Sequence, residues 1–367
     1  MSDPRIDKLA KVLVNYSVEI KAGDWVRVGA HVLALPAVTA VVREVIHAGG
    51  HVTVQLSSDE LEETILREAS EDQLKWVSPL DKLLYERVDV LISIGATNNT
   101  RGLTSLDPKR QQITQIARKE LTETYLRRSA EGSLRWVGTQ FPCSALAQDA
   151  EMSLREYEDF VYAATFVDQP DPIAKWQEIH NEQQRLVEWL KGKKTVEAQG
   201  PNVDLKLSIQ GHTFINADGK KNMPSGEIFT GPVEDSVNGW IRFTYPAIRA
   251  GREVEGVTFK FKDGKVAEAT AEKNEAYLIS QLDSDPGARY LGEFAIGTNF
   301  GITRFTKSIL FDEKIGGTMH LAVGAGYPET GSENKSSIHW DFICDMRKDS
   351  EIRVDGDLFY KNGKFCV

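Results

Sequence analysis

The sequence predicts an α/β protein of two domains, in which an N-terminal doubly wound parallel sheet precedes a β-rich mixed α+β domain. Three observations lead to this fold class. The length of 367 residues exceeds what one hydrophobic core usually organises. Strand and helix patterns alternate in the first part of the chain, whereas short strands and turn dipeptides dominate the second. Two prolines within 168–176 lie between these parts, so we expect domains at 1–170 and 171–367.

The first part of the chain alternates between helical and strand patterns. Asp3-Pro4 is a helix-start signal, and apolar residues then recur at helical spacing as far as Tyr16. Strand patterns follow at 24–30, 51–56, 88–96 and 134–142. Helical patterns occur at 36–48, across 58–86, near 108–128 and near 150–164. Strands separated by helices are typical of a parallel sheet covered by helices.

Ligands of such sheets often bind at the carboxyl ends of the strands, where the segment IGATNNTRG (94–102) is predicted to lie. The chain has no GxGxxG after the first strand and no GxxxxGK[ST] motif, so neither a dinucleotide site nor a P-loop has support. We therefore expect 94–102 to be an ordinary polar turn.

The second part of the chain is expected to be rich in short strands. A long polar helical pattern follows the prolines, and strand patterns such as VDLKLSIQG, LGEFAIGTN and IHWDFICDM come after it. The dipeptides Asp263-Gly264 and Asn362-Gly363 are typical hairpin turns. We expect few helices in this domain.

The composition narrows the class of partner and the compartment. A net charge of −10 disfavours nucleic acid, because binding to phosphates requires clustered Lys and Arg, and it leaves small molecules or short peptides. The opening segment has charges within its apolar pattern, unlike a signal peptide, and we expect no membrane span. Three cysteines without a CxxC pair fit a reducing compartment, so we expect a cytoplasmic protein. Cys143 is expected to be structural rather than a nucleophile.

Two histidines lie inside apolar strand patterns, where a polar side chain is costly unless something pairs with it. They are His320 and His339. His339 and Asp341 are two residues apart, so both side chains leave the same face of their strand. An imidazole beside a carboxylate suits a divalent transition metal, and a His–Asp hydrogen bond in a half-buried strand fits these two residues equally well.

Two glutamates lie in similar surroundings. Glu293 is part of an apolar run, and Glu227 is framed by turn residues in NMPSGEIFTGP. A salt bridge would explain either glutamate alone. A metal site explains two Glu, two His and one Asp together more simply. The other histidines are expected to be surface, packing or turn residues, namely His31, His47, His51, His180 and His212.

The motifs NMPSGEIFTGP, LGEFAIGTN, GTMHLAVGAGYP and IHWDF follow one another in an order that resembles the aminopeptidase T/aminopeptidase S family of bacterial dinuclear metallo-aminopeptidases. The similarity runs through nearly the whole chain. It implies a homodimer, two divalent metal ions (zinc, cobalt or manganese) in the C-terminal domain, and short peptides with a free N-terminus as substrates. It places the family's metal ligands on Glu227, Glu293, His320, His339 and Asp341, and its active-site tyrosine on Tyr327.

The resemblance also suggests roles for three catalytic residues. We expect Glu293 to bridge the metals and Glu227 to be a ligand or the proton shuttle, although the sequence does not separate these two roles. Tyr327 is expected to donate a hydrogen bond to the developing oxyanion, although a strand-end tyrosine with its hydroxyl in water also fits. The segment between His320 and His339 looks shorter than in typical members, which concerns substrate preference more than the metals.

Two other functions stay open at this point. A mononuclear iron ring-cleaving dioxygenase would use His320, His339 and Asp341 as its ligand triad. Such an iron has no need of two further carboxylates, so Glu227 and Glu293 favour the dinuclear hydrolase. A metal-stabilised dimeric binding protein without catalytic activity would leave Tyr327 without a purpose.

Overall fold

The computed structural model describes residues 3–249 and 251–367, which form two compact units. Unit 1 comprises Met1–Ile173 and Gly219–Met223, and unit 2 comprises Ala174–Asp218 and Pro224–Val367. The first break lies close to the predicted boundary, but the sequence did not indicate that Gly219–Met223 returns to unit 1. That 1–170 and 171–367 are separate folding domains stays a prediction. Within the two described ranges, no helix combines the length and the apolar character that crossing a membrane requires.

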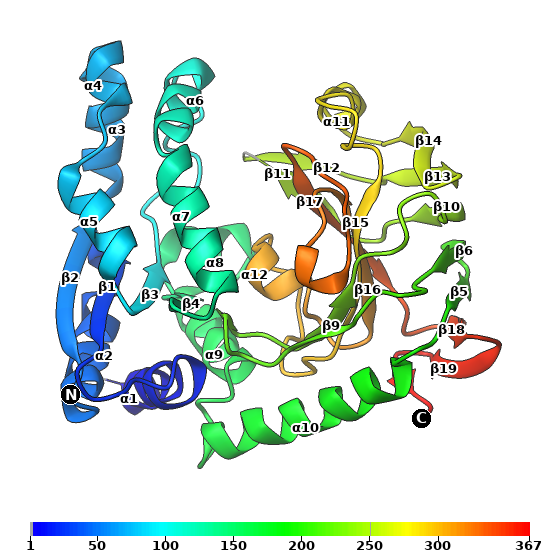
Figure 1. The fold of residues 1–367 in the computed structure, drawn as a ribbon, viewed down its shortest axis with the longest axis horizontal. Helices are drawn as coiled ribbons and strands as arrows, with labels where there is room; N and C mark the ends of the chain where they lie inside the picture. Colours follow the sequence, from blue (N-terminus) through cyan, green and yellow to red (C-terminus); the bar gives the residue numbers. More distant parts are fainter. Residues whose placement is uncertain (1–2, 250) are drawn as a thin grey trace. The chain divides into compact units, whose positions relative to one another are not determined.

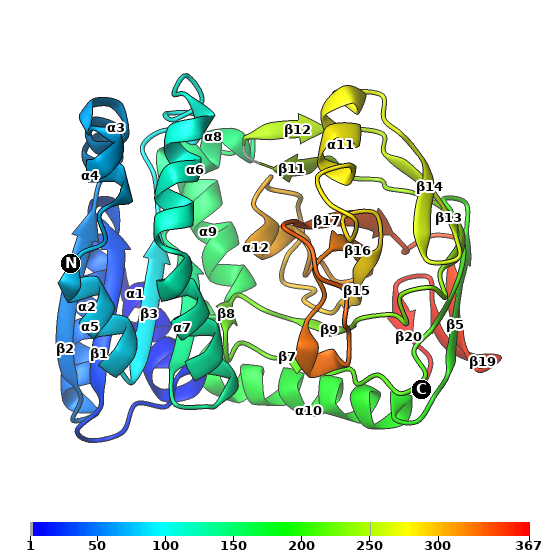
Figure 2. The same ribbon diagram turned by 45° about the horizontal axis from the view of Figure 1, so that its top comes forward.

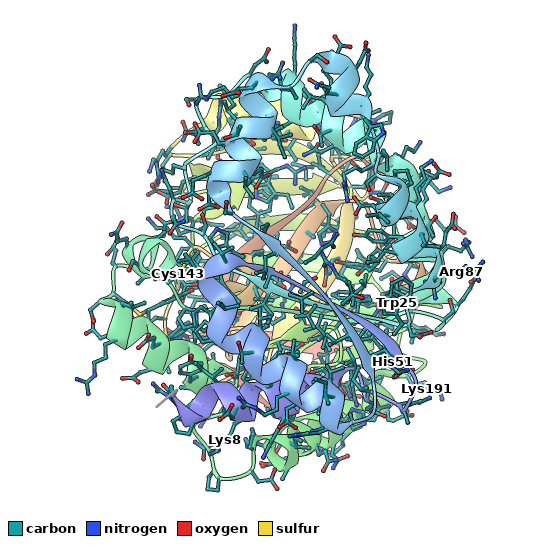
Figure 3. The ribbon with its side chains drawn as sticks, turned by 90° about the vertical axis from the view of Figure 1, so that its left-hand side faces the viewer. Lys8, Trp25, His51, Arg87, Cys143 and Lys191 are labelled. Carbon is teal, nitrogen blue, oxygen red and sulfur yellow. The ribbon has the colours of Figure 1, made fainter. Side chains whose placement is uncertain are left out.

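Unit 1 is built on a five-stranded parallel sheet of order β2-β1-β3-β4-β8 (Figure 1). Its strands are β1 (Trp25–His31), β2 (His51–Ser57), β3 (Val90–Gly95), β4 (Arg135–Gln140) and β8 (Asn222–Met223). The chain builds the sheet outward in both directions from β1, which confirms the predicted doubly wound parallel sheet. Trp25 and His51 begin neighbouring strands at one end of the sheet, and Cys143 lies toward the other end (Figure 3).

The helices of unit 1 are α1 (Pro4–Lys11), α2 (Leu35–His47), α3 (Asp59–Glu68), α4 (Glu71–Lys75), α5 (Pro79–Arg87), α6 (Pro108–Ala117), α7 (Lys119–Ala130), α8 (Ser144–Asp149) and α9 (Leu154–Ala164). A π-helical turn, Val12–Ser17, continues α1. The helical pattern across 58–86 is therefore three helices, because Ser70 and Ser78 each cap a new one. The helix expected near 108–128 is likewise divided at Arg118, and that near 150–164 begins at Leu154.

Unit 2 begins within α10 (Pro172–Leu190) and contains two larger sheets. The eight-stranded sheet has the order β14-β13-β10-β6-β5-β18-β19-β20, with β5 (Thr195–Gly200), β6 (Val203–Ser208), β10 (Asn238–Arg242), β13 (Thr258–Lys262), β14 (Lys265–Thr270), β18 (Glu351–Val354), β19 (Asp357–Lys361) and β20 (Lys364–Phe365). The five-stranded sheet has the order β17-β16-β15-β9-β7, with β7 (Ile215–Ala217), β9 (Glu227–Thr230), β15 (Leu291–Gly297), β16 (Thr318–Gly324) and β17 (His339–Asp345). β11 (Ala247–Arg249) pairs with β12 (Arg252–Val254). The described part of unit 2 also contains α11 (Glu275–Leu282), α12 (Ile309–Asp312) and a short 3-10 helix, Pro328–Thr330.

One face of the five-stranded sheet packs into the core of unit 2. Alternate residues of β16, namely Met319, Leu321 and Val323, are fully buried in this core. Phe342 of β17 joins them, and its ring centroid lies 5.0 Å from that of Phe259 in the other sheet. Because successive side chains of a strand point to opposite faces, the residues between these apolar positions must occupy the other face. The predicted ligands His320 and Asp341 are among them.

Candidate metal centre

The five predicted ligands belong to four neighbouring strands of the five-stranded sheet, β17, β16, β15 and β9. Figure 2 shows these strands side by side. In the antiparallel register, Ala322 of β16 lies opposite Glu293 of β15 and opposite Asp341 of β17. The partners of Ala295 and Gly297 along β15 are His320 and Glu227, respectively. Since alternate residues share a face, the register places the following side chains together: Glu227, Glu293, His320, His339 and Asp341.

The two histidines of this face are joined by one carboxylate. His320 Nε2 lies 3.3 Å from Glu227 Oε2 and 3.7 Å from Glu293 Oε1. His339 Nε2 lies 3.2 Å from Glu293 Oε2 and 3.5 Å from Asp341 Oδ1. Glu293 therefore turns one oxygen toward each histidine.

The ligand atoms form two overlapping groups that share Glu293. One group is Glu227, Glu293 and His320, the other is Glu293, His339 and Asp341, and the atoms of each lie within 4.8 Å of one another. A set of three ligand atoms, drawn from carboxylate oxygens and imidazole nitrogens, is typical of sites for divalent cations. The short side chains of Ala295 and Ala322 lie between these ligands on the same face. The arrangement suits two cations with a shared carboxylate.

Several buried polar atoms of this cluster have no hydrogen-bond partner within the described residues. They are Glu227 Oε2, Asp341 Oδ1 and His320 Nδ1. A buried carboxylate oxygen without a partner is costly, and a cation would satisfy it. His339 Nδ1 lies 2.8 Å from the Ala325 carbonyl oxygen, which can only accept a hydrogen bond. Its ring N–H is therefore at Nδ1, and Nε2 is free to coordinate a metal. On these grounds the residues present fit a metal centre.

The pKa values of the cluster reflect burial and crowded negative charge. Burial raises the pKa of Glu227 to about 7, although Lys314 opposes this shift. Burial also resists ionisation of Glu293, but hydrogen bonds from His320 and His339 outweigh it and hold the pKa of Glu293 at about 2. Burial alone would lower the pKa of His320, yet Glu293 and Glu227 raise it to about 9. The site thus attracts cations, and a metal must displace protons from the imidazoles to bind.

Two charged residues beside the site were missed by the sequence analysis. Glu313 forms a third group of possible ligand atoms with His320 and Asp341. Lys314 is fully buried, pairs with Glu227 Oε1 at 3.7 Å, and contacts Glu313 Oε1. The available signal was a Glu-Lys pair directly between the apolar helix α12 and the strand that carries His320.

Tyr327 lies beside the cluster in the segment after β16. Its ring centroid is 5.1 Å from that of His339 and 5.3 Å from that of Phe229. The residue is 39% exposed, so solvent or a ligand can reach it. Burial, followed by the charge of Glu293, raises the pKa of Tyr327 and keeps its hydroxyl protonated. Its position permits the predicted oxyanion role, which stays a prediction.

The remaining sites considered from the sequence have local partners. His180 Nδ1 lies 2.7 Å from Asp218 Oδ2, and His212 Nδ1 lies 2.6 Å from the Gly231 carbonyl oxygen. His31 is buried and accepts a hydrogen bond from the backbone of Leu33, whereas His47 and His51 are exposed. The buried Cys143 thiol donates to the Thr97 carbonyl oxygen at 3.1 Å.

Carboxylates and imidazoles gathered on one face of an antiparallel sheet are typical of the ligand sets of metallohydrolases. The chain belongs to the thermophilic metalloprotease family (M29), which it matches over residues 2–365. The family resemblance predicted from the motifs is thereby confirmed.

Similar proteins match nearly the whole of this chain. Aminopeptidase 2 of Geobacillus stearothermophilus is 30% identical over 405 aligned positions that cover 99% of this chain and 95% of that protein. Aminopeptidase T of Thermus aquaticus is 28% identical, with 96% and 94% covered. The structure of wild-type AmpT from Thermus thermophilus superposes with a TM-score of 0.87 at 23% identity over 99% of both chains. This likeness confirms the predicted fold class.

Proposed function

We propose that the protein is a metal-dependent aminopeptidase that hydrolyses the N-terminal peptide bond of short unblocked peptides. The observation that carries this proposal is the sharing of Glu293 between two histidine–carboxylate groups. Membership of a metalloprotease family and similarity to proteins named aminopeptidases support it. The rival dioxygenase gains no support from these relatives. A single iron would need His320, His339 and Asp341 alone, whereas the strand register places Glu227 and Glu293 beside them.

We assign Glu227, Glu293 and His320 to one divalent ion and Glu293, His339 and Asp341 to a second, with Glu293 as the bridge. When bound, two such ions would supply an activated water at neutral pH and would polarise the scissile carbonyl. Glu227 lies at the edge of the cluster with one oxygen on Lys314, which favours a ligand role over a proton shuttle. Tyr327, with its protonated hydroxyl, donates a hydrogen bond to the oxyanion.

The finer features of the proposal rest on ligand chemistry and on the resemblance. Carboxylate and imidazole ligands without thiolate accept zinc, cobalt or manganese, so availability decides the occupant. Three free cysteines support a cytoplasmic location, and the resemblance supports a homodimer. The 405 aligned positions exceed the 367 residues of this chain, so the Geobacillus relative carries insertions. Insertions between His320 and His339 would affect substrate preference.

The test is to remove bound metal with a chelator and then to titrate the metal-free protein with zinc, cobalt or manganese. The release of an amino acid from a short peptide is measured at each step. The matched control is the same peptide with an acetylated N-terminus. We expect release from the unblocked peptide alone, with at least one metal. No release with any metal, together with oxygen consumption on a hydroxylated pyridine in the presence of iron, would replace the peptidase with the dioxygenase.

A further inference from the structure

We infer that Lys314 is a positioning residue of the metal centre, which holds one oxygen of Glu227 so that the other faces His320. This inference rests on the proposed metal-dependent function. It assigns a role to a buried cation that the five-ligand site leaves unexplained.

Lys314 is anchored at both its backbone and its side chain. Its N–H donates to the Phe311 carbonyl oxygen at 3.0 Å, and its own carbonyl oxygen accepts from the Asn299 N–H at 3.0 Å. The side chain is fully buried, and its two ion pairs within the described residues are with Glu227 and Glu313. A lysine is almost never buried in this way unless its charge is paired. The ammonium group therefore has a fixed position beside β9.

The two oxygens of Glu227 have different surroundings because of this lysine. Oε1 lies 3.7 Å from Lys314 Nζ, whereas Oε2 lies 3.3 Å from His320 Nε2 and has no hydrogen-bond partner in the described part of the chain. The backbone of Glu227 is fixed by its pairing with Gly297 in β15. With the backbone and Oε1 both held, Oε2 is presented as a single ligand atom toward the cluster. Partners of metal ligands orient them in this way.

The crowded carboxylates of the cluster also favour a cation at this position. Four carboxylates gather here, on Glu227, Glu293, Glu313 and Asp341. When all are ionised, the ammonium group of Lys314 leaves three net negative charges. Bound divalent cations would offset this remaining negative charge. A buried site with balanced charges avoids the cost of an unpaired ion.

A purely structural buried ion pair predicts something different. Its loss would lower the stability of unit 2 without selecting one metal over the other. Lys314 pairs with Glu227, which belongs to one of the two assigned ligand groups, and with Glu313, which belongs to neither of them. Among the described residues it has no ion pair with Asp341 of the second group. Positioning through Glu227 therefore predicts that removal of the ammonium group weakens one metal equivalent and leaves the second unchanged.

The experiment is a titration of the full chain with cobalt. Binding is measured by calorimetry and by the visible absorption of bound cobalt. We expect the wild type to bind two equivalents and Lys314→Met to bind one of them about 10–100-fold more weakly, as for other partners of metal ligands. Lys314→Arg keeps the charge and should show a smaller loss at the same equivalent. In the background of Glu227→Gln, Lys314→Met should add no further loss, since its effect passes through Glu227. Lys273→Met, which removes an exposed lysine paired with Glu253 and Glu255, is the matched control and should change nothing.

Several outcomes would overturn this role. They are equal weakening of both equivalents, tighter binding after loss of the repelling charge, or an additive loss in the Glu227→Gln background. Unchanged affinity in Lys314→Met, or in Lys314→Arg if the Met variant does not fold, would also overturn it. A wild type that binds no cobalt, zinc or manganese would overturn the proposed function together with this inference, whereas a wild type with two equivalents and an unaffected variant overturns only the inference.

Discussion

Each unit surrounds a buried histidine with polar groups, but the charge balance differs. In unit 1, His31 Nε2 lies 3.5 Å from Asp59 Oδ1, and the other oxygen of Asp59 accepts from Thr97 Oγ1 and the Asn98 backbone. One carboxylate thus serves several neutral donors. In unit 2, four carboxylates surround His320 and His339 with one ammonium group among them. Excess negative charge, rather than a buried histidine, distinguishes the metal centre.

The largest effect is expected from Glu293→Gln, because this residue belongs to both ligand groups. Removal of a residue that hydrogen-bonds to a metal ligand typically lowers metal affinity or activity about 10–100-fold. Removal of a ligand that both groups share should therefore lower metal affinity and activity by more than about 100-fold. Metal content by elemental analysis and peptide turnover should fall together. Undiminished turnover with two bound metals would rule out the bridging role.

The next largest effect is expected from Tyr327→Phe, which removes the hydroxyl and keeps the ring contacts with Phe229 and His339. Loss of one oxyanion donor typically lowers kcat by about 10²–10³. We expect a lower kcat at nearly constant KM and unchanged metal content, measured by steady-state kinetics. If kcat is unchanged, Tyr327 is an ordinary strand-end residue.

The pH dependence of stability should reverse when metal binds. In the metal-free protein, burial raises the pKa of Glu227 to about 7. Burial alone would lower the pKa of His320, but the neighbouring carboxylates raise it to about 9. Both values exceed the ordinary pKa values of 4.5 and 6.5, so the folded state holds more protons and its stability should fall as pH rises from 4.5 to about 9.

Saturating metal should turn this decline into a rise, because metal binding displaces the same protons and strengthens as pH rises. Thermal unfolding midpoints, measured with a chelator and with excess manganese across this pH range, check both trends. If the unfolding midpoint of the metal-free protein rises with pH, the directions assigned to the pKa shifts of Glu227 and His320 are wrong.

The smallest effect is expected from Asp59→Asn in unit 1. The substitution weakens the hydrogen bonds from Thr97 and Asn98 and should lower the free energy of unfolding by about 1–2 kcal/mol. Metal content and turnover should stay at wild-type values, as assessed by urea unfolding and the peptide assay. A loss of bound metal in this variant would show that the distinction between the two units is wrong.

Much of the fold followed from local patterns. The strands of unit 1 lie where β-branched residues are concentrated, and Val26, Val28, Val90 and Ile92 are fully buried there. The helical patterns expected across 58–86 are confirmed, but their breaks were not located, since apolar spacing continues across Ser70 and Ser78 while their side chains cap new helices. The return of Gly219–Met223 was not predictable, because β8 has two residues and pairs with β4 only through tertiary folding.

The sequence by itself singled out the residues that we propose as metal ligands, since a carboxylate or imidazole inside an apolar strand is costly unless it is paired. It also determined that His339 and Asp341 share a face, through the two-residue period of a strand. Only the tertiary structure decided that Glu293 lies between the two histidines, because register between distant strands sets that placement. It also decided that Lys314 meets Glu227, since burial turns an ordinary Glu-Lys pair into part of the site.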